Sequence, residues 1–480
     1  MSTTLDYNEE VLFQAQTRRA TVEFINIVND LWYDKSIELV LFRNPLVDKR
    51  ASEVLNLIAY AKEFISKPIS IQDALDIGKA IQQLDLPSSK LDIGKLAYEW
   101  YLSSKNSGDK VAFVQQKLKN ATTAKDIRPK DVVLYGFGRI GRLLARELMV
   151  KMGKGSQLRL RAIVTRGEIN YTVLEKRASL LSIDSVHGDF LGTVEIDGEN
   201  NALIINGTTV HMISANNPED INYTKYGIND ALVIDNTGAF RDKEALSRHL
   251  KGEGVAKVLI TAPAKGVANI VHGVNHKQHN PDNVDIFSAA SCTTNAIVPI
   301  LKVLEDNYGI KKGHLETIHA YTNDQNLVDN MHSKYRRGRA AALNMVITET
   351  GAGAAVAKAI PALEGRLTSN AIRVPVPNGS LAILSLQLRT KVTKERINSL
   401  IKKYALEGDL VEQIKYSMDN ELVSSDIVGI TAPSIFDSKA TIADEEAIVI
   451  YVWYDNEYGY SHQVIRLAKH IAKVRRYTYY

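Results

Sequence analysis

A glycine-rich turn constrains the fold of this 480-residue chain more than any other feature. The apolar run at residues 132–135 has the composition of a buried strand, and the sequence Gly-Phe-Gly-Arg-Ile-Gly follows it at residues 136–141. An amphipathic run then predicts a helix. G-x-G-x-x-G between a strand and a helix is typical of a dinucleotide-binding βαβ unit.

Each glycine of this turn has a distinct physical task. Gly136 allows the tight turn, Gly138 lets the backbone approach a pyrophosphate, and Gly141 permits close packing of helix and strand. The start of the helix adds amide donors and a partial positive charge, which favour an anion. The alternative is a glycine-rich turn without any ligand.

The hydrophobic pattern changes near residue 127. Before it, apolar residues recur at helical spacing and predict an all-α domain; after it, short β-rich runs alternate with helices and predict a parallel sheet. Beyond residue 292 longer strands predict a mixed or antiparallel sheet. We therefore expect an α/β chain: a helical N-terminal extension (1–127), a Rossmann-type dinucleotide-binding domain (128–291, joined by a C-terminal helix at 457–480) and an α+β catalytic domain (292–456).

Composition excludes several classes of protein. A single cysteine precludes an intramolecular disulfide, and with an acidic N-terminal segment it favours a cytoplasmic, reducing compartment. No apolar run reaches the length of a membrane span, and no cluster with metal-ligand spacing is evident. A net charge of +4 is too small to argue for nucleic-acid binding.

The single cysteine, Cys292, stands in a polar cluster, Ser-Cys-Thr-Thr-Asn, directly before an apolar periodic run. This pattern predicts a helix start, where free amides and the helix dipole stabilise a thiolate. A nucleophilic thiol needs a base, and His319 lies where a strand-like run enters a polar loop. The alternative is a buried structural cysteine.

At this point the motifs resemble those of phosphorylating glyceraldehyde-3-phosphate dehydrogenases. The resemblance runs from about residue 132 to 475, in the order GFGRIGR, DSVHGDF, NTGAF, TAPAK, SCTTNA, HAYTNDQ, RRGRAAALNM, TGA, IRVPVPNGS and WYDNEYGYS. The first 125 residues have no counterpart in the usual family chain. Their simplest role is added oligomerisation or stability.

The resemblance implies a covalent mechanism. Cys292 would attack the substrate aldehyde, and His319 would activate the thiol and shuttle the proton. Hydride transfer to the nicotinamide would leave a thioester, which inorganic phosphate would attack to release 1,3-bisphosphoglycerate. Two anion sites are then needed. The family pattern matches Thr322, Asp324 and Arg373 to the site of the substrate phosphate, where the acidic Asp324 would orient Arg373 or a ribose hydroxyl and not meet the phosphate. It matches Ser291, Thr293, Thr350 and Gly351 to the site of inorganic phosphate.

The resemblance also implies how a cofactor is held. Arg139 and Ile140 would lie beside the pyrophosphate, and Thr237 and Thr261 would line the dinucleotide groove. Asn456 would hold the nicotinamide carboxamide, and the Tyr460 ring would pack near it. NAD-specific members often carry Leu-Pro where this chain has Asn330-Met331. The second strand of the parallel sheet ends in Thr165-Arg166 with no acid at its tip, which tolerates a 2′-phosphate, whereas Glu168 could instead reach the ribose. We expect dual use of NAD and NADP, or a preference for NADP, as suits a gluconeogenic direction.

The family pattern further implies a homotetramer, because the basic loop that holds Arg336, Arg337 and Arg339 packs across a subunit interface and near the anion sites in the family. A basic run is otherwise a solvated surface. Two other functions remain open: a related enzyme such as erythrose-4-phosphate or semialdehyde dehydrogenase, and a non-catalytic regulatory protein on the same fold. The retention of both Cys292 and His319 argues against the second.

Overall fold

The computed structural model describes residues 6–63, 65–103, 108–122 and 127–480. Internal contacts divide the chain into two compact units. Unit 1 comprises residues 1–128, 152–157 and 475–480, and unit 2 comprises residues 129–151 and 158–474. Part of the connection expected before residue 128, residues 123–126, lies outside the described residues.

Unit 1 is largely helical, as the apolar spacing predicts. Amphipathic packing explains this: α1 buries Phe24, Ile27 and Leu31 on one side, and α3 begins at Ser70, whose side chain accepts the Asp73 amide. The helices are α1 (Tyr7–Lys35), α2 (Ala51–Glu63), α3 (Ile71–Gln82), α4 (Ile93–Ser103) and α5 (Lys110–Lys117).

Unit 1 also contains a small sheet, so the all-α description of this region is incomplete. Its order is β2-β1-β3-β22, with β1 (Glu38–Leu41), β2 (Asn44–Pro45), β3 (Ser89–Asp92) and β22 (Tyr477–Tyr479). Strands of two to four residues are too short for a periodic pattern to reveal. Since β22 pairs in parallel with β3, residues 475–480 belong to unit 1 and not, as expected, to the dinucleotide-binding domain.

The first sheet of unit 2 confirms the Rossmann-type prediction. β13 through β10 run parallel, while β9 and β8 extend the far edge as an antiparallel pair. The sheet order is β13 (Ile286–Ser288), β12 (Val255–Ile260), β11 (Ala231–Asp235), β4 (Lys130–Tyr135), β5 (Leu158–Thr165), β10 (Thr208–Ser214), β9 (Ala202–Ile205) and β8 (Val194–Asp197). The chain order reverses between β4 and β11, and this switch point is where such sheets bind ligands.

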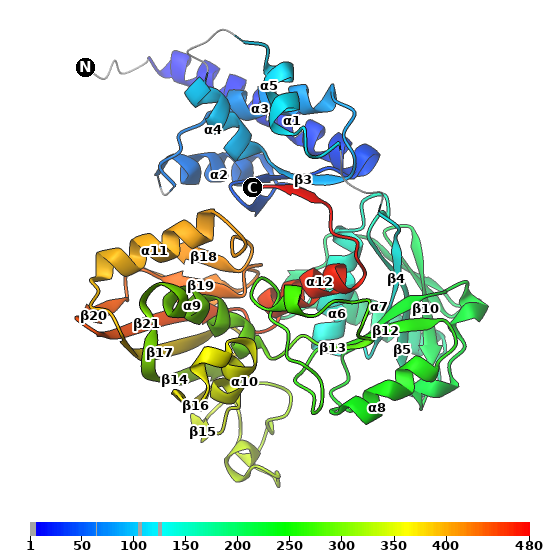
Figure 1. Ribbon diagram of the computed structural model, residues 1–480. Coiled ribbons are helices and arrows are strands. Elements are labelled where there is room, and N and C mark those ends of the chain that lie inside the picture. The colour runs from blue at the N-terminus through cyan, green and yellow to red at the C-terminus, as the bar shows by residue number, and fades with distance from the viewer. Residues whose placement is uncertain (1–5, 64, 104–107, 123–126) are drawn as a thin grey trace. The chain divides into compact units, whose positions relative to one another are not determined.

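Helices pack on this parallel sheet and connect its strands. α6 (Arg139–Val150) begins directly after the glycine turn, and α12 (Tyr458–Ile471) packs against α6 (Figure 1). α7 (Tyr171–Ser182) and α8 (Lys243–Ser247) complete the connections. The close approach of α6 to β4 requires Gly141, because a Cβ there would lie 2.5 Å from the Gly136 carbonyl oxygen.

The second sheet of unit 2 is mixed, as predicted. Its order is β15 (Val346–Thr348), β16 (Leu367–Val374), β14 (Ile310–Ala320), β17 (Ser380–Leu388), β21 (Ala447–Tyr454), β19 (Ser434–Asp437) and β18 (Ile414–Ser417), and β20 (Ile442–Asp444) pairs with β21. Three helices lie on one face of this sheet: α9 (Cys292–Tyr308), α10 (Ala352–Ala359) and α11 (Lys394–Leu406) (Figure 1). Their apolar residues and the inward strand residues form one continuous core.

Candidate active site

Cys292 is the first residue of α9, where the sequence places a reactive thiol. Ser291 caps the helix by accepting the Thr294 amide at 3.1 Å, and the thiol remains partly exposed. Ala290 has a φ of 56°, a conformation that costs a non-glycine residue about 1–3 kcal/mol. The Tyr460 hydroxyl donates to the Ala290 carbonyl at 2.9 Å, so it supports the bend that presents the thiol.

His319 lies at the end of β14, with its Nε2 atom 3.5 Å from the Cys292 Sγ atom. Its Nδ1 atom lies 2.7 Å from the Ala320 carbonyl, so a proton on Nδ1 leaves the Nε2 lone pair facing the thiol. Burial and the positive Arg373 lower the pKa of His319 to about 3, whereas burial raises the pKa of the thiol. The resting pair is therefore a thiol and a neutral imidazole ready to accept its proton.

A cluster of charged and polar side chains adjoins this pair. β16 pairs with β14 in a register that sets Arg373 beside His319, and the guanidinium Nη1 donates to the Ala320 carbonyl and to the Thr322 hydroxyl, both at 3.0 Å. Its buried Nε has no hydrogen-bond partner within the described part of the chain. Arg373 also acts to lower the thiol pKa, which shows that its charge reaches Cys292.

Arg337 completes this charged cluster, and it belongs to the basic loop that the resemblance places near the anion sites. Thr322 donates to Asp324, and Asp324 forms an ion pair with Arg337, whose side chain is only 11% exposed. Asp324 thus reaches Arg373 through the Thr322 hydroxyl and not directly. Two guanidinium groups against one carboxylate leave a net positive charge, which fits a phosphate group. The residue pattern alone allows this basic run to be a solvated surface, but the burial of Arg337 shows that this arginine is not solvated.

Replacing Arg337 by leucine should raise the KM for a phosphorylated aldehyde by about 10–100-fold, because a charge-assisted contact is lost. Steady-state rates would show this, and the alkylation rate of Cys292 should stay within about twofold because the thiol does not contact Arg337. Arg339→Leu is the matched control, since Arg339 pairs with Asp329 on the exposed side of the same loop. An equal effect of both substitutions would contradict a phosphate role for Arg337.

The residues expected to bind inorganic phosphate gather at two helix starts. Thr350 and Gly351 precede α10, which packs against α9, and the Thr350 hydroxyl accepts the Ala352 amide at 3.3 Å. The Thr293 hydroxyl lies 3.1 Å from that of Tyr454, a buried residue that also contacts Thr317. Thr293 would therefore offer an anion its main-chain amide and not its hydroxyl. Tyr454 is a residue near the thiol that the sequence did not reveal.

The glycine turn forms a cradle that fits a dinucleotide. Gly136 has a φ of 100°, and no atom lies within 4 Å of the position that a Cβ would take at Gly138. The space over Gly138 therefore admits a diphosphate, and the Arg139, Ile140 and Gly141 amides at the start of α6 face it. The Arg139 side chain turns elsewhere, to Asp184 and Glu457.

The other predicted cofactor residues line the strand ends around this turn. Thr237 and Thr261 both bond to Asp235 at the end of β11, which fixes the edge of the groove. Thr165 is buried at the end of β5, and Arg166 is exposed beside it. Asn456 is buried after β21, where its Oδ1 accepts the Ser380 hydroxyl at 2.8 Å.

The described residues contain neither a metal-holding cluster nor a membrane-spanning helix. No set of three or more histidine, cysteine, aspartate or glutamate side chains there is arranged to hold a metal ion. No helix in those ranges combines the length and apolar character needed to cross a membrane.

The glycine cradle on a parallel sheet, beside a mixed-sheet domain with a cysteine–histidine pair, defines an NAD-dependent dehydrogenase. Residues 130–243 match the model for the glyceraldehyde 3-phosphate dehydrogenase NAD binding domain, and residues 291–456 match the model for its C-terminal domain. The chain belongs to the glyceraldehyde-3-phosphate dehydrogenase family, which confirms the resemblance seen in its motifs.

Three relatives show how far this similarity extends. A glyceraldehyde-3-phosphate dehydrogenase-like protein of Pseudomonas aeruginosa is 47% identical over 94% of this chain and 98% of its own length. Glyceraldehyde-3-phosphate dehydrogenases of Streptomyces coelicolor (41% identical) and Bacillus subtilis (40% identical) cover 70% and 71% of this chain, and 96% and 98% of their own lengths. The Pseudomonas protein thus matches most of the N-terminal region as well.

Proposed function

We propose that the protein catalyses the reversible oxidative phosphorylation of glyceraldehyde 3-phosphate to 1,3-bisphosphoglycerate through a thioester on Cys292. The observation that carries this proposal is the pairing of Cys292 with His319 at 3.5 Å beside a side-chain cluster of net positive charge. The thiol supplies the nucleophile, and the charged cluster suits the phosphate of the substrate. Family membership supports the same reaction.

The side chains divide the proton and charge handling among themselves. His319 Nε2 takes the thiol proton as Sγ bonds to the aldehyde carbon, and the resulting hemithioacetal carries that proton on its oxygen. The glycine cradle, Thr237, Thr261 and Asn456 would hold NAD or NADP, whose nicotinamide would accept a hydride from the hemithioacetal carbon. Loss of that hydride, together with transfer of the hydroxyl proton to His319, leaves a thioester. Phosphate held at the starts of α9 and α10 attacks the carbonyl carbon, and the sulfur departs as thiolate.

We further propose that the enzyme uses NADP as well as NAD, or prefers it. Arg166 is exposed directly after β5, where an acid would repel a 2′-phosphate, and Met331 is 92% exposed where family members often have proline. Both features leave room and charge for the additional phosphate. The single cysteine fits a reducing cytoplasmic compartment.

Initial rates should show comparable or greater kcat/KM with NADP than with NAD, using glyceraldehyde 3-phosphate and inorganic phosphate. Replacing Arg166 by glutamate should lower kcat/KM for NADP by about tenfold or more and leave that for NAD within about twofold, because the new charge repels only the 2′-phosphate. A large preference of the unaltered enzyme for NAD would contradict the proposed use of NADP. A rate independent of phosphate would contradict phosphorolysis, and faster turnover of erythrose 4-phosphate would favour the related enzyme.

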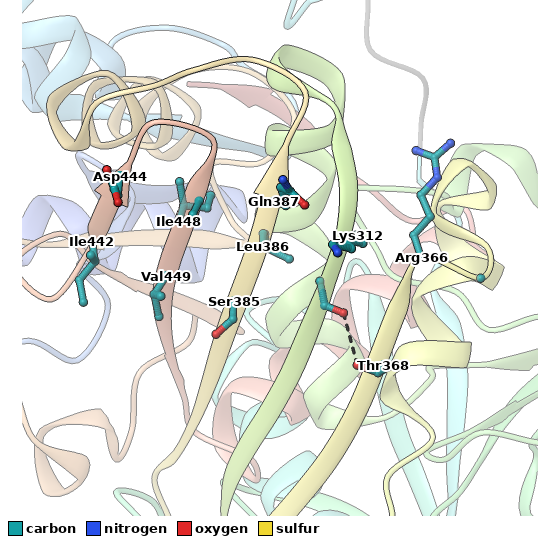
Figure 2. Close-up of a pocket in the computed structure, with 13 residues that line it drawn as sticks. Lys312, Arg366, Thr368, Ser385, Leu386, Gln387, Ile442, Asp444, Ile448 and Val449 are labelled. Atoms are coloured by element: carbon teal, nitrogen blue, oxygen red, sulfur yellow. Dashed lines mark hydrogen bonds between the residues drawn. The ribbon is translucent and has the colours of Figure 1, made fainter.

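We propose a homo-oligomer, with a tetramer as the family expectation. The face of the second sheet away from α9 carries a hollow of about 620 Å³, and Figure 2 shows Ile442, Val449 and Ser385 along neighbouring strands of it. Apolar side chains are also exposed in the loop after β14, at Leu327, Val328, Met331 and Leu343. Exposed apolar surface of this kind is typical of a subunit interface.

A further inference from the structure

The segment Asp184–Phe190, one of the family landmarks, plays no part in the chemistry proposed above. It forms a short hairpin of β6 (Ile183–Asp184) and β7 (Gly188–Asp189). The Asp184 Oδ1 atom accepts the amides of Val186 at 2.9 Å and His187 at 3.0 Å, which fixes the turn. Burial opposes ionisation, but these amides and Arg139 together hold the pKa of Asp184 at about 2. The carboxylate is therefore charged at neutral pH.

Arg139 connects this hairpin to α12. Its Nη1 atom lies 2.5 Å from Asp184, while Nε and Nη2 donate to the two oxygens of Glu457 at 2.9 and 2.5 Å. His187 Nε2 adds a contact of 3.0 Å to Glu457. A bidentate pair of this kind fixes both distance and orientation. Since both carboxylates neutralise Arg139, its side chain has no spare charge for a diphosphate.

Glu457 directly follows Asn456, the residue expected to hold the nicotinamide carboxamide. The turn here is tight: Asp455 Oδ1 accepts the amides of Glu457 and Tyr458 at 2.9 and 2.7 Å. Asn456 is tied on its other side to Ser380. The Glu457 carboxylate thus links Arg139, the first residue of α6, to the tight turn that contains Asn456.

We propose that Glu457 is a positioning residue that, through Arg139 and His187, fixes Asn456 relative to the glycine cradle. It sets the placement of the nicotinamide end of the cofactor, whereas the adenosine diphosphate end binds without it. This role rests on the proposed dinucleotide-dependent activity. It also gives the Asp184–Phe190 segment a task, because that segment holds Arg139 and His187 in place.

Binding of NAD and of ADP-ribose, which lacks the nicotinamide, tests this role by titration calorimetry on the full chain. Glu457→Gln keeps the shape but loses the charge. It should weaken NAD binding about tenfold, leave ADP-ribose binding within about twofold, and slow single-turnover hydride transfer. Alkylation of Cys292 without cofactor should not change. Glu147→Gln is the matched control, since Glu147 also joins α6 to α12, but through the side chains of His462 and Tyr458 and not through Arg139.

The outcomes separate the possibilities. Unchanged NAD affinity in Glu457→Gln, or equal weakening of NAD and ADP-ribose, would overturn the positioning role alone. If that variant does not fold, Asp184→Asn decides, because it loosens the same link from the other side and should weaken NAD about threefold but not ADP-ribose. Binding of neither NAD nor NADP by the unaltered protein would overturn the proposed function together with this role.

Discussion

Replacing Cys292 by serine is expected to lower dehydrogenase turnover by about 10⁴-fold or more, because a hydroxyl is a far weaker nucleophile than a thiol. The change is small in volume and keeps the first residue of α9 polar, so the fold should persist. Progress curves of reduced cofactor would measure the loss, and circular dichroism and cofactor binding would verify the fold.

Because the chain has a single cysteine, labelling of the thiol reports on Cys292 alone. Iodoacetamide can label only Cys292 in the unaltered chain, so the serine variant should take up no cysteine label. Turnover retained at more than about 1% in a variant verified by mass would assign the nucleophile to another residue.

Replacing His319 by asparagine should slow formation of the acyl enzyme by about 10²–10⁴-fold, the usual contribution of a positioned base. The imidazole pKa of about 3 keeps His319 able to accept a proton throughout the neutral range, so the deficit should persist from pH 6 to 9, about the stable range of most proteins. Rapid-mixing measurements of the first turnover would isolate this step.

His314→Asn is the matched control for His319. His314 lies on the same strand, but it is exposed and its ring contacts Thr368 and Asn370 at 2.8 Å. Its replacement should leave the first turnover within about twofold of the unaltered enzyme. Equal losses in both variants would show a general effect on β14 in place of base catalysis.

Local sequence patterns predicted the two features that depend on neighbouring residues. The glycine turn after β4 identified the cradle, because turn, approach and packing each require glycine at a set spacing. The polar cluster around Cys292, followed by an apolar periodic run, likewise identified the start of α9 from neighbouring residues alone. His319, 27 residues from Cys292, was a candidate base because it stands where a strand-like run enters a polar loop, and the resemblance then singled it out.

Features that depend on distant contacts were not predictable in the same way. By residue pattern alone Arg337 belongs to a solvated basic run; the resemblance placed that loop near the anion sites, and the ion pair with Asp324 shows which of its arginines joins the charged cluster. Arg139 was expected to serve the cofactor, yet its side chain reaches Glu457, 318 residues away. β22 of unit 1 is three residues long and pairs with β3 (Ser89–Asp92), which lies far earlier in the chain, so no local pattern predicts their pairing.

The intact mass of the enzyme after incubation with glyceraldehyde 3-phosphate and cofactor, without inorganic phosphate, shows whether Cys292 carries a thioester. We expect one phosphoglyceroyl group per chain, located on Cys292 by peptide mapping, absent from Cys292→Ser and released when phosphate is added. Full reduction of cofactor with no adduct at Cys292, or an adduct that phosphate does not release, would contradict the thioester mechanism.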